Sequence, residues 1–139
     1  AANLSGKAIN ISRTTAPHAV SYPFTSLYNI SHGHAVSLTL EKFLKFNFIN
    51  HKKASCNFDL NLRYKSIFNI FGVKNIIELE NFFIEMKKKA KLESNFEKLK
   101  INLNLNIDKL ISGINLQRLQ NNPINLNKKD IKTILLKSN

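Results

Sequence analysis

Two histidines, His18 and His32, are the residues in this sequence best suited to chemistry, because imidazole is a common metal ligand and titrates near neutral pH. They lie fourteen positions apart. On one straight helix that separation is roughly 21 Å, whereas two ligands of one ion must each lie about 2 Å from it. The pair can share a metal ion only if the chain reverses between the two residues. The turn residues Tyr28 and Asn29 predict that reversal.

The sequence around His32 favours a neutral imidazole ring. Ser31 is a candidate N-cap, which places His32 in the first turn of the next helix. The positive end of the helix dipole disfavours the imidazolium form at that position. Gly33 leaves room beside the ring for a ligand or a second backbone segment. A metal ion bound here next to a substrate oxygen would support redox or hydrolytic chemistry.

Two imidazoles do not complete a metal site, because zinc and iron need at least a third protein ligand. The neighbouring candidates are poor. His34 points to another side of the helix that begins at His32, His51 lies in a loop among lysines, and the nearest acidic residue is Glu41. The spacing alone therefore leaves open that both histidines of the pair are ordinary surface or core residues.

Length and composition indicate one folded domain. The chain has 139 residues, of which 43% are hydrophobic, enough for a single core. Cys56 is the one cysteine, which excludes an internal disulfide and favours a reducing compartment, so we expect a cytoplasmic protein. No run approaches ~18 uninterrupted apolar residues, so we expect no transmembrane helix and no membrane partner.

The formal net charge is +12, which is compatible with nucleic-acid binding. The lysines and arginines are nevertheless spread along the chain, and the densest runs, 87–89 and 128–129, fit solvated ends or faces of helices. The surplus of Asn, Ile and Lys is typical of an AT-rich coding sequence. We expect no specific nucleic-acid partner, and a basic nucleic-acid-binding domain remains the less favoured alternative.

Apolar residues recur at helical spacing along most of the chain, which predicts an all-α fold with no clear domain boundary. The expected helices cover about residues 1–12, 15–28, 32–48, 59–71, 73–91, 93–100, 109–114, 116–119 and 128–136. The tract 101–106 alternates apolar and polar residues, and we expect an extended loop there. Pro23 should kink or loosen the second helix, while Asp108 and Asn127 are the expected N-caps of two late helices.

Two parts of the sequence have a distinctive pattern: residues 6–40, which contain the runs Thr14-Thr15-Ala16-Pro17-His18 and Ser31-His32-Gly33-His34, and the tail Leu119-Gln120-Asn121-Asn122-Pro123. Both parts resemble the iron-containing (group III) alcohol dehydrogenases, most closely the phosphonoacetaldehyde reductase-like branch. The resemblance is specific over about residues 1–48 and looser beyond. It implies that residues 1–139 form the multi-helix C-terminal domain of the dehydroquinate synthase-like fold.

Members of this family bind NAD(P) in an N-terminal Rossmann-like domain and a metal ion in the C-terminal helical domain. An Asp and a His on an earlier helix hold the metal together with two histidines fourteen positions apart, which correspond to His18 and His32. The resemblance thus implies Fe²⁺ or Zn²⁺, and NAD(P)H bound by a preceding domain. That domain and the first ligand helix are not in this sequence, so we expect a C-terminal part that is inactive alone, from a homo-oligomeric enzyme.

The resemblance also suggests residues that act on substrate. Many members have a further histidine four positions after the first metal ligand, where this chain has Tyr22. A phenol can donate or relay a proton, although it replaces imidazole poorly near neutral pH. Lys7, Asn10 and Arg13 follow one another at spacings of three on a helix and could bind a phosphonate headgroup. A solvated helix face or an interdomain contact is the alternative for these three.

The expected reaction is reduction of a small aldehyde to an alcohol, with phosphonoacetaldehyde and 2-hydroxyethylphosphonate as the candidate pair. The metal would polarise the carbonyl oxygen and the nicotinamide would supply hydride. An alternative function, outside enzyme catalysis, is that of a helical remnant or pseudoenzyme that acts by protein association.

Overall fold

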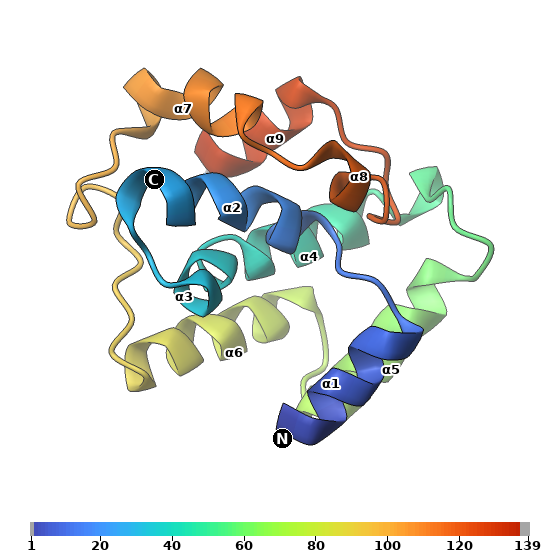
Figure 1. Ribbon diagram of the computed structural model, residues 1–139. Helices are drawn as coiled ribbons and strands as arrows, with labels where there is room; N and C mark the ends of the chain where they lie inside the picture. Colours follow the sequence, from blue (N-terminus) through green and yellow to red (C-terminus); the bar gives the residue numbers. More distant parts are fainter. Residues whose placement is uncertain (1, 137–139) are drawn as a thin grey trace.

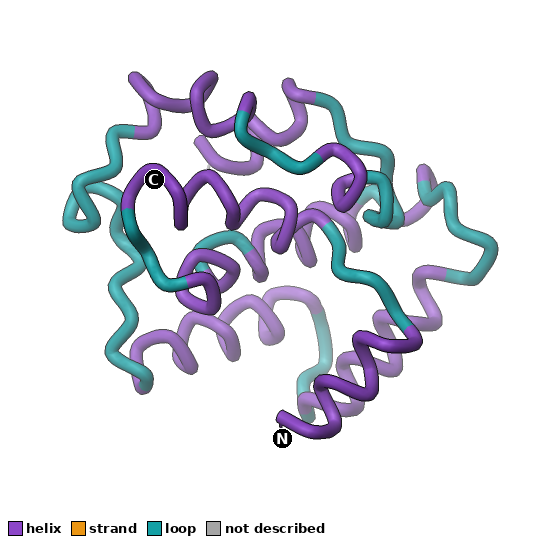
Figure 2. The backbone as a smooth tube through the Cα atoms, viewed as in Figure 1, coloured by secondary structure: helices purple, strands orange, loops and turns teal. Residues whose placement is uncertain are grey.

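The computed structural model describes residues 2–136, which form α-helices joined by loops (Figures 1 and 2). The helices are α1 (Ala2–Ile11), α2 (Ala16–Tyr28), α3 (His32–Ser37), α4 (Leu40–Ile49), α5 (Leu60–Phe71), α6 (Ile76–Lys89), α7 (Leu103–Ser112), α8 (Leu116–Leu119) and α9 (Lys128–Leu136), with a 3₁₀ turn, η1, at His51–Lys53. No strand occurs in this part of the chain, where Ala54 and Ile124 form an isolated β-bridge. The all-α prediction is confirmed. Residue 1, where the first predicted helix begins, lies outside the described residues.

Helix α2 lies at the centre of the molecule, between α7 and α9 on one side and α3, α4 and α6 on the other (Figure 1). It contacts α3, α7 and α8 directly. Val20 and Phe24 on α2 are almost fully buried, and the Phe24 ring stacks on Phe96 with centroids 5.8 Å apart. Burial of such side chains contributes about 1.5–3 kcal/mol each. The continuous core around α2 therefore fixes the helix that carries His18.

A second apolar cluster joins α4, α5 and α6. Leu79 is fully buried there, and the hydroxyl of the buried Tyr64 donates to the Leu44 carbonyl oxygen at 2.7 Å. Burial raises the pKa of the Tyr64 phenol. A buried ion pair, Lys87 Nζ to Glu41 Oε1 at 2.6 Å, also links α6 to α4.

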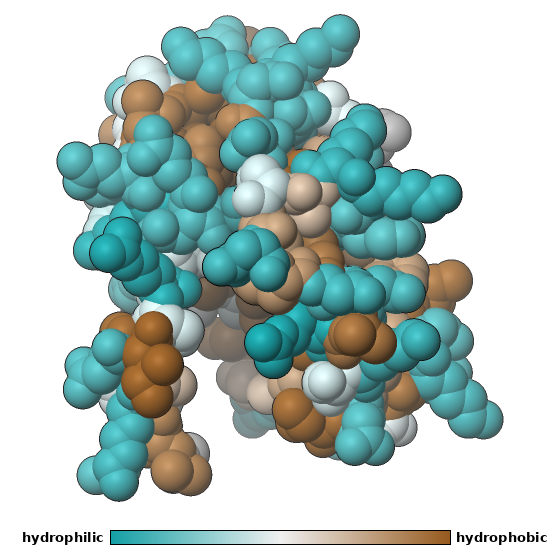
Figure 3. Space-filling view, turned by 90° about the vertical axis from the view of Figure 1, so that its right-hand side faces the viewer, coloured by the Kyte–Doolittle hydropathy of each residue, from teal (hydrophilic) through white to brown (hydrophobic). Residues whose placement is uncertain are grey.

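Helix α1 stands clear of the rest of the molecule, at the lower left of Figure 3. Every residue from Asn3 to Arg13 is exposed. The predicted apolar face of this helix does not enter the core, since Leu4 is 71% and Ile11 91% exposed.

The single helix predicted over 32–48 is wrong, because the structure divides it at Leu38 and Thr39. The Thr39 N–H bonds the Val36 carbonyl at 3.2 Å, a 3₁₀-type bond, and the Thr39 carbonyl starts α4 by accepting from Phe43. Leu38 and Thr39 are both essentially fully buried. Adjacent positions on one straight helix point about 100° apart, so packing of both residues in the core overrides the continuous helical pattern.

The helix predicted over 93–100 and the loop predicted over 101–106 are also wrong. The first segment is irregular and ends in turns, and Lys100 has a φ of 59° in the left-handed region. Helix α7 begins at Leu103 and is capped by Asn102, whose side chain accepts from Leu105 N–H, so Asp108 is not its cap. The alternating apolar and polar residues of 101–106 led to the wrong prediction, because the apolar Leu105 is 81% exposed. The buried residues of α7 follow helical spacing instead: Leu103, Ile107, Leu110 and Ile111.

The remaining helices were predicted correctly within a few residues. α2 continues through Pro23 to Tyr28, and α6 starts at Ile76, three residues later than expected, because the Asn75 side chain caps it. Asn127 caps α9 as predicted, since its Oδ1 accepts from Asp130 N–H at 3.0 Å. No helix between residues 2 and 136 combines the length and hydropathy needed to cross a bilayer.

Candidate metal site

The turn between α2 and α3 brings His18 and His32 together. Asn29 ends α2 in the left-handed conformation, with φ 53° and ψ 32°, and its N–H donates to the Thr25 carbonyl at 3.1 Å. The chain then turns back, and α3 packs on α2. The two imidazole rings face each other edge to face, with centroids 4.9 Å apart and planes at 68°. The reversal predicted at Tyr28 and Asn29 is confirmed.

The two rings are close enough to approach one metal ion. An ion about 2.1 Å from one nitrogen of each ring, at a tetrahedral angle, would set the ring centroids roughly 5.3 Å apart. The observed separation is 4.9 Å. Burial lowers the pKa of His18, and the charges of His32 and Arg118 lower it further. His18 is therefore neutral at pH 7, the form in which imidazole binds iron or zinc.

Ser21, which the sequence analysis missed, connects the two histidines. It is fully buried, and its hydroxyl donates to the His18 carbonyl oxygen at 2.8 Å. Because the hydroxyl proton is used on His18, the weaker 3.4 Å contact with His32 Nδ1 forms a hydrogen bond when Nδ1 carries the ring proton. That tautomer leaves the lone pair of His32 on Nε2, available to a metal ion. The sequence signal was the spacing of three from His18, at which serine bonds a helix carbonyl.

Tyr22 and Arg118 lie beside the histidine pair. The Tyr22 ring lies 5.4 Å from the His32 ring, centroid to centroid. An N–H of Arg118 donates to the Tyr22 hydroxyl oxygen, and the guanidinium carbon lies 4.8 Å from the centroid of the Tyr22 ring. Arg118 belongs to α8, 96 positions after Tyr22. No local pattern in the sequence could have associated it with the site.

Other candidate ligands are engaged elsewhere. His34 Nε2 lies 2.6 Å from the Glu93 carbonyl oxygen, and His51 Nδ1 lies 2.8 Å from the Phe48 carbonyl oxygen. The Glu41 carboxylate is paired with Lys87. Within residues 2–136, no group of three or more His, Cys, Asp or Glu side chains could hold a metal ion. The chain therefore presents two imidazoles, of which His32 is exposed, and further ligands must come from outside these residues.

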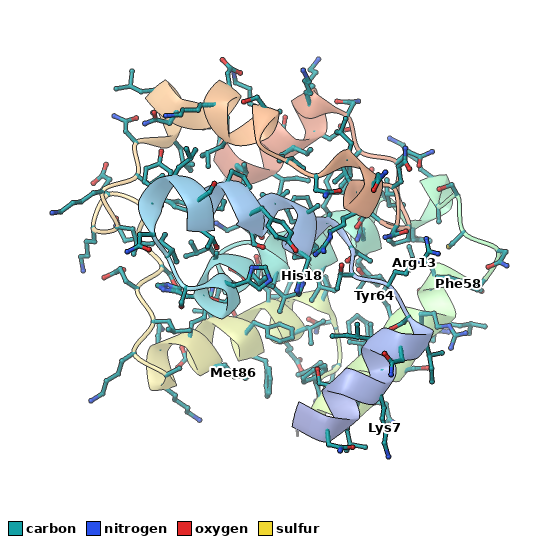
Figure 4. The ribbon with its side chains drawn as sticks, in the orientation of Figure 1. Lys7, Arg13, His18, Phe58, Tyr64 and Met86 are labelled. Carbon is teal, nitrogen blue, oxygen red and sulfur yellow. The ribbon has the colours of Figure 1, made fainter. Side chains whose placement is uncertain are left out.

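Lys7, Asn10 and Arg13 are not brought to the histidine pair. All three are exposed, and Figure 4 shows Lys7 on α1, away from His18. In the described part of the chain, no hydrogen bond, ion pair or ring contact joins any of them to the candidate metal site. Their role in substrate binding stays a prediction.

The sequence model of the Fe-containing alcohol dehydrogenase family, C-terminal part, matches residues 1–139. The chain belongs to this family. It is also similar to phosphonoacetaldehyde reductase of Streptomyces viridochromogenes, with 45% identity over 47 residues. That match covers 34% of this chain and 12% of the relative, so the chain aligns with only a small part of that protein. No solved structure matches the chain.

For an Fe-containing alcohol dehydrogenase, the pair of imidazoles has a direct interpretation. The family carries iron, and imidazole nitrogen is a suitable ligand for it. His18 and His32 are the described residues that bring two imidazole rings together, 4.9 Å apart between centroids, and Ser21 contacts both of them. The three residues that the sequence suggested for ligation or catalysis lie in one cluster: His18, His32 and Tyr22.

Proposed function

We propose that the complete protein is a metal-dependent aldehyde reductase that uses NAD(P)H, and that His18 and His32 are two of its metal ligands. The observation that supports this most is the facing pair of imidazoles, 4.9 Å apart, in a chain matched along its length by the C-terminal model of Fe-containing alcohol dehydrogenases. When bound, Fe²⁺ or Zn²⁺ supplies Lewis-acid polarisation of the substrate carbonyl. The other ligands and the nicotinamide site would lie in parts of the protein outside this sequence.

The residues of this chain would contribute in distinct ways. His18 offers a neutral ring because burial disfavours its charged form. Ser21 orients His32 so that Nε2 is the free nitrogen. The Tyr22 hydroxyl can donate its proton to the oxygen that gains negative charge as the aldehyde is reduced.

The substrate we propose is phosphonoacetaldehyde, which would be reduced to 2-hydroxyethylphosphonate. The support is the similarity to a protein named phosphonoacetaldehyde reductase. We also propose that the enzyme acts in the cytoplasm, because Cys56 is the one cysteine and no disulfide within the chain is possible.

The test is oxidation of NADH and NADPH by the complete protein with a panel of aldehydes, before and after chelation of the metal. We expect turnover that chelation abolishes and that added Fe²⁺ or Zn²⁺ restores. The 139-residue chain alone should show no turnover under the same conditions. Full activity after exhaustive chelation, or metal-dependent turnover by the 139-residue chain, would contradict the proposal.

A further inference from the structure

Among the described residues, Arg118 has no carboxylate partner, and it lies next to the candidate metal site. A guanidinium has five N–H donors, and one of them is used on the Tyr22 hydroxyl. Over residues 2–136, none of the ion pairs involves Arg118. The side chain is only half-buried, so its other donors can reach a ligand.

The fold positions Arg118 from several sides. The Asn115 side chain accepts from the backbone N–H of Arg118 at 3.0 Å and so caps α8. The next residue, Leu119, is buried in the main core. Asn121 then donates from its side chain to the Thr14 carbonyl oxygen at 3.2 Å, which ties the end of α8 to the start of α2. The backbone that carries Arg118 is therefore fixed relative to α2 before any ligand binds.

Arg118 reaches the histidine pair through Tyr22, whose hydroxyl oxygen accepts from an Arg118 N–H and whose ring lies 5.4 Å from the His32 ring, centroid to centroid. Among the described residues, Glu41 is the acidic residue nearest in sequence to the pair, and its carboxylate is engaged with Lys87 and not with Arg118. An uncompensated guanidinium beside a reaction site is suited to an anionic substrate group, which it can bind through two parallel N–H donors.

We propose that Arg118 binds the anionic headgroup of the aldehyde and makes the enzyme prefer anionic aldehydes, with Tyr22 holding the guanidinium in place. This inference rests on the proposed function. In phosphonoacetaldehyde a single methylene separates the phosphonate from the carbonyl. The group that binds the phosphonate must therefore lie close to the residues that act on the carbonyl, as Arg118 does through Tyr22.

The test compares kcat/KM of the complete enzyme for phosphonoacetaldehyde and for 3,3-dimethylbutanal, a neutral analogue in which a tert-butyl group replaces the phosphonate. Arg118→Gln should lower kcat/KM for the anionic aldehyde about 10- to 100-fold, mainly through KM, as expected for loss of charge-assisted hydrogen bonds. The value for the neutral aldehyde should change by less than about threefold. Arg118→Lys keeps the charge without the planar fork and should give an intermediate loss.

Arg63→Gln is the matched control, because Arg63 is an exposed residue of α5 whose guanidinium also lies over an aromatic ring, 5.4 Å from the Phe58 centroid. This control variant should leave kcat/KM unchanged for both aldehydes. An equal loss on both aldehydes with Arg118→Gln, together with a lower Tm, would assign Arg118 a purely structural role and overturn the inference. An unchanged preference of the Arg118→Gln enzyme for the anionic aldehyde would overturn the inference as well.

Calorimetric titration with 2-hydroxyethylphosphonate tests the same inference without turnover. The complete protein and the Arg63→Gln variant should bind it, and Arg118→Gln should bind it at least about tenfold more weakly. If the protein reduces no aldehyde, the proposed function fails while this titration still decides the role of Arg118. Equal binding by all three proteins would overturn the inference.

Discussion

The Ser21 hydroxyl lies 3.4 Å from Nδ1 of His32 while it donates to the carbonyl oxygen of His18, 2.8 Å away. One buried side chain thus contacts both residues of the candidate metal pair. The hydroxyl proton is used on His18, so His32 must supply the proton of its own contact. In that tautomer the free nitrogen of His32 is Nε2.

Ser21→Ala should weaken metal binding by the complete enzyme about 10- to 100-fold, the usual effect of removing a group that orients a metal ligand. The measurement is the metal dissociation constant from competition with a chelator of known affinity. Ser26→Ala is the control, because the Ser26 hydroxyl also bonds a carbonyl three residues earlier on α2, that of Pro23, at 3.5 Å. Equal affinities for the Ser21→Ala variant and the unmodified enzyme would show that the Ser21 contact does not orient His32.

Stability of the metal-free chain should depend on the protonation of His18, whose pKa is lowered from 6.5 by burial and by the charges of His32 and Arg118. Between the folded-state value and 6.5, the unfolded chain binds more protons than the folded chain. The free energy of unfolding should therefore decrease as the pH falls through that window. NMR titration of the His18 ring should give a pKa below 6.5, and Arg118→Gln should raise it.

The urea midpoint measured from pH 7.5 to pH 4.5 gives the matching thermodynamic test. The decrease below pH 6.5 should be smaller in His18→Gln, because that variant lacks the titrating ring. A His18 resonance that titrates at or above 6.5 would contradict the assignment of burial as the dominant cause.

Asn102→Ala should lower the free energy of unfolding by about 0.5–2 kcal/mol, because it removes the side chain that caps α7. Asp108→Ala should change it by less than about 0.5 kcal/mol, since Asp108 is exposed and its ion pair with Lys132, at 3.7 Å, is a surface contact. Urea denaturation of the two variants distinguishes the observed cap from the one that the sequence pattern suggested. A larger effect at Asp108 would place the start of this helix where the pattern put it.

The sequence predicted the helical class and the reversal at Asn29 because both depend on local signals. Asn is one of the few residues that accept the left-handed conformation at a helix end. The failures at Thr39 and Leu105 have the opposite cause. Thr39 is buried by contacts across the fold, and Leu105, an apolar residue in an alternating pattern, is exposed. Neither outcome can be read from neighbours in the chain.

The residues of the candidate site also divide into those placed by local sequence signals and those placed by tertiary packing. His18, Ser21 and His32 belong to one helix–turn–helix segment, so their proximity follows once the turn is known. Arg118 reaches the site from α8, and only the packing of α8 on α2 places it there. The exposed position of α1 was likewise not predictable, because its apolar residues have the spacing of a core-facing helix.

The metal content of the complete protein tests the central claim most directly. Inductively coupled plasma mass spectrometry of the unmodified enzyme should find bound iron or zinc, and His18→Ala and His32→Ala should each remove most of it. His51→Ala is the control, since His51 contacts the Phe48 carbonyl and lies outside the pair, and it should retain the metal. Circular dichroism should show that all variants keep their helical content. Full metal occupancy in a folded His18→Ala or His32→Ala protein would contradict the account.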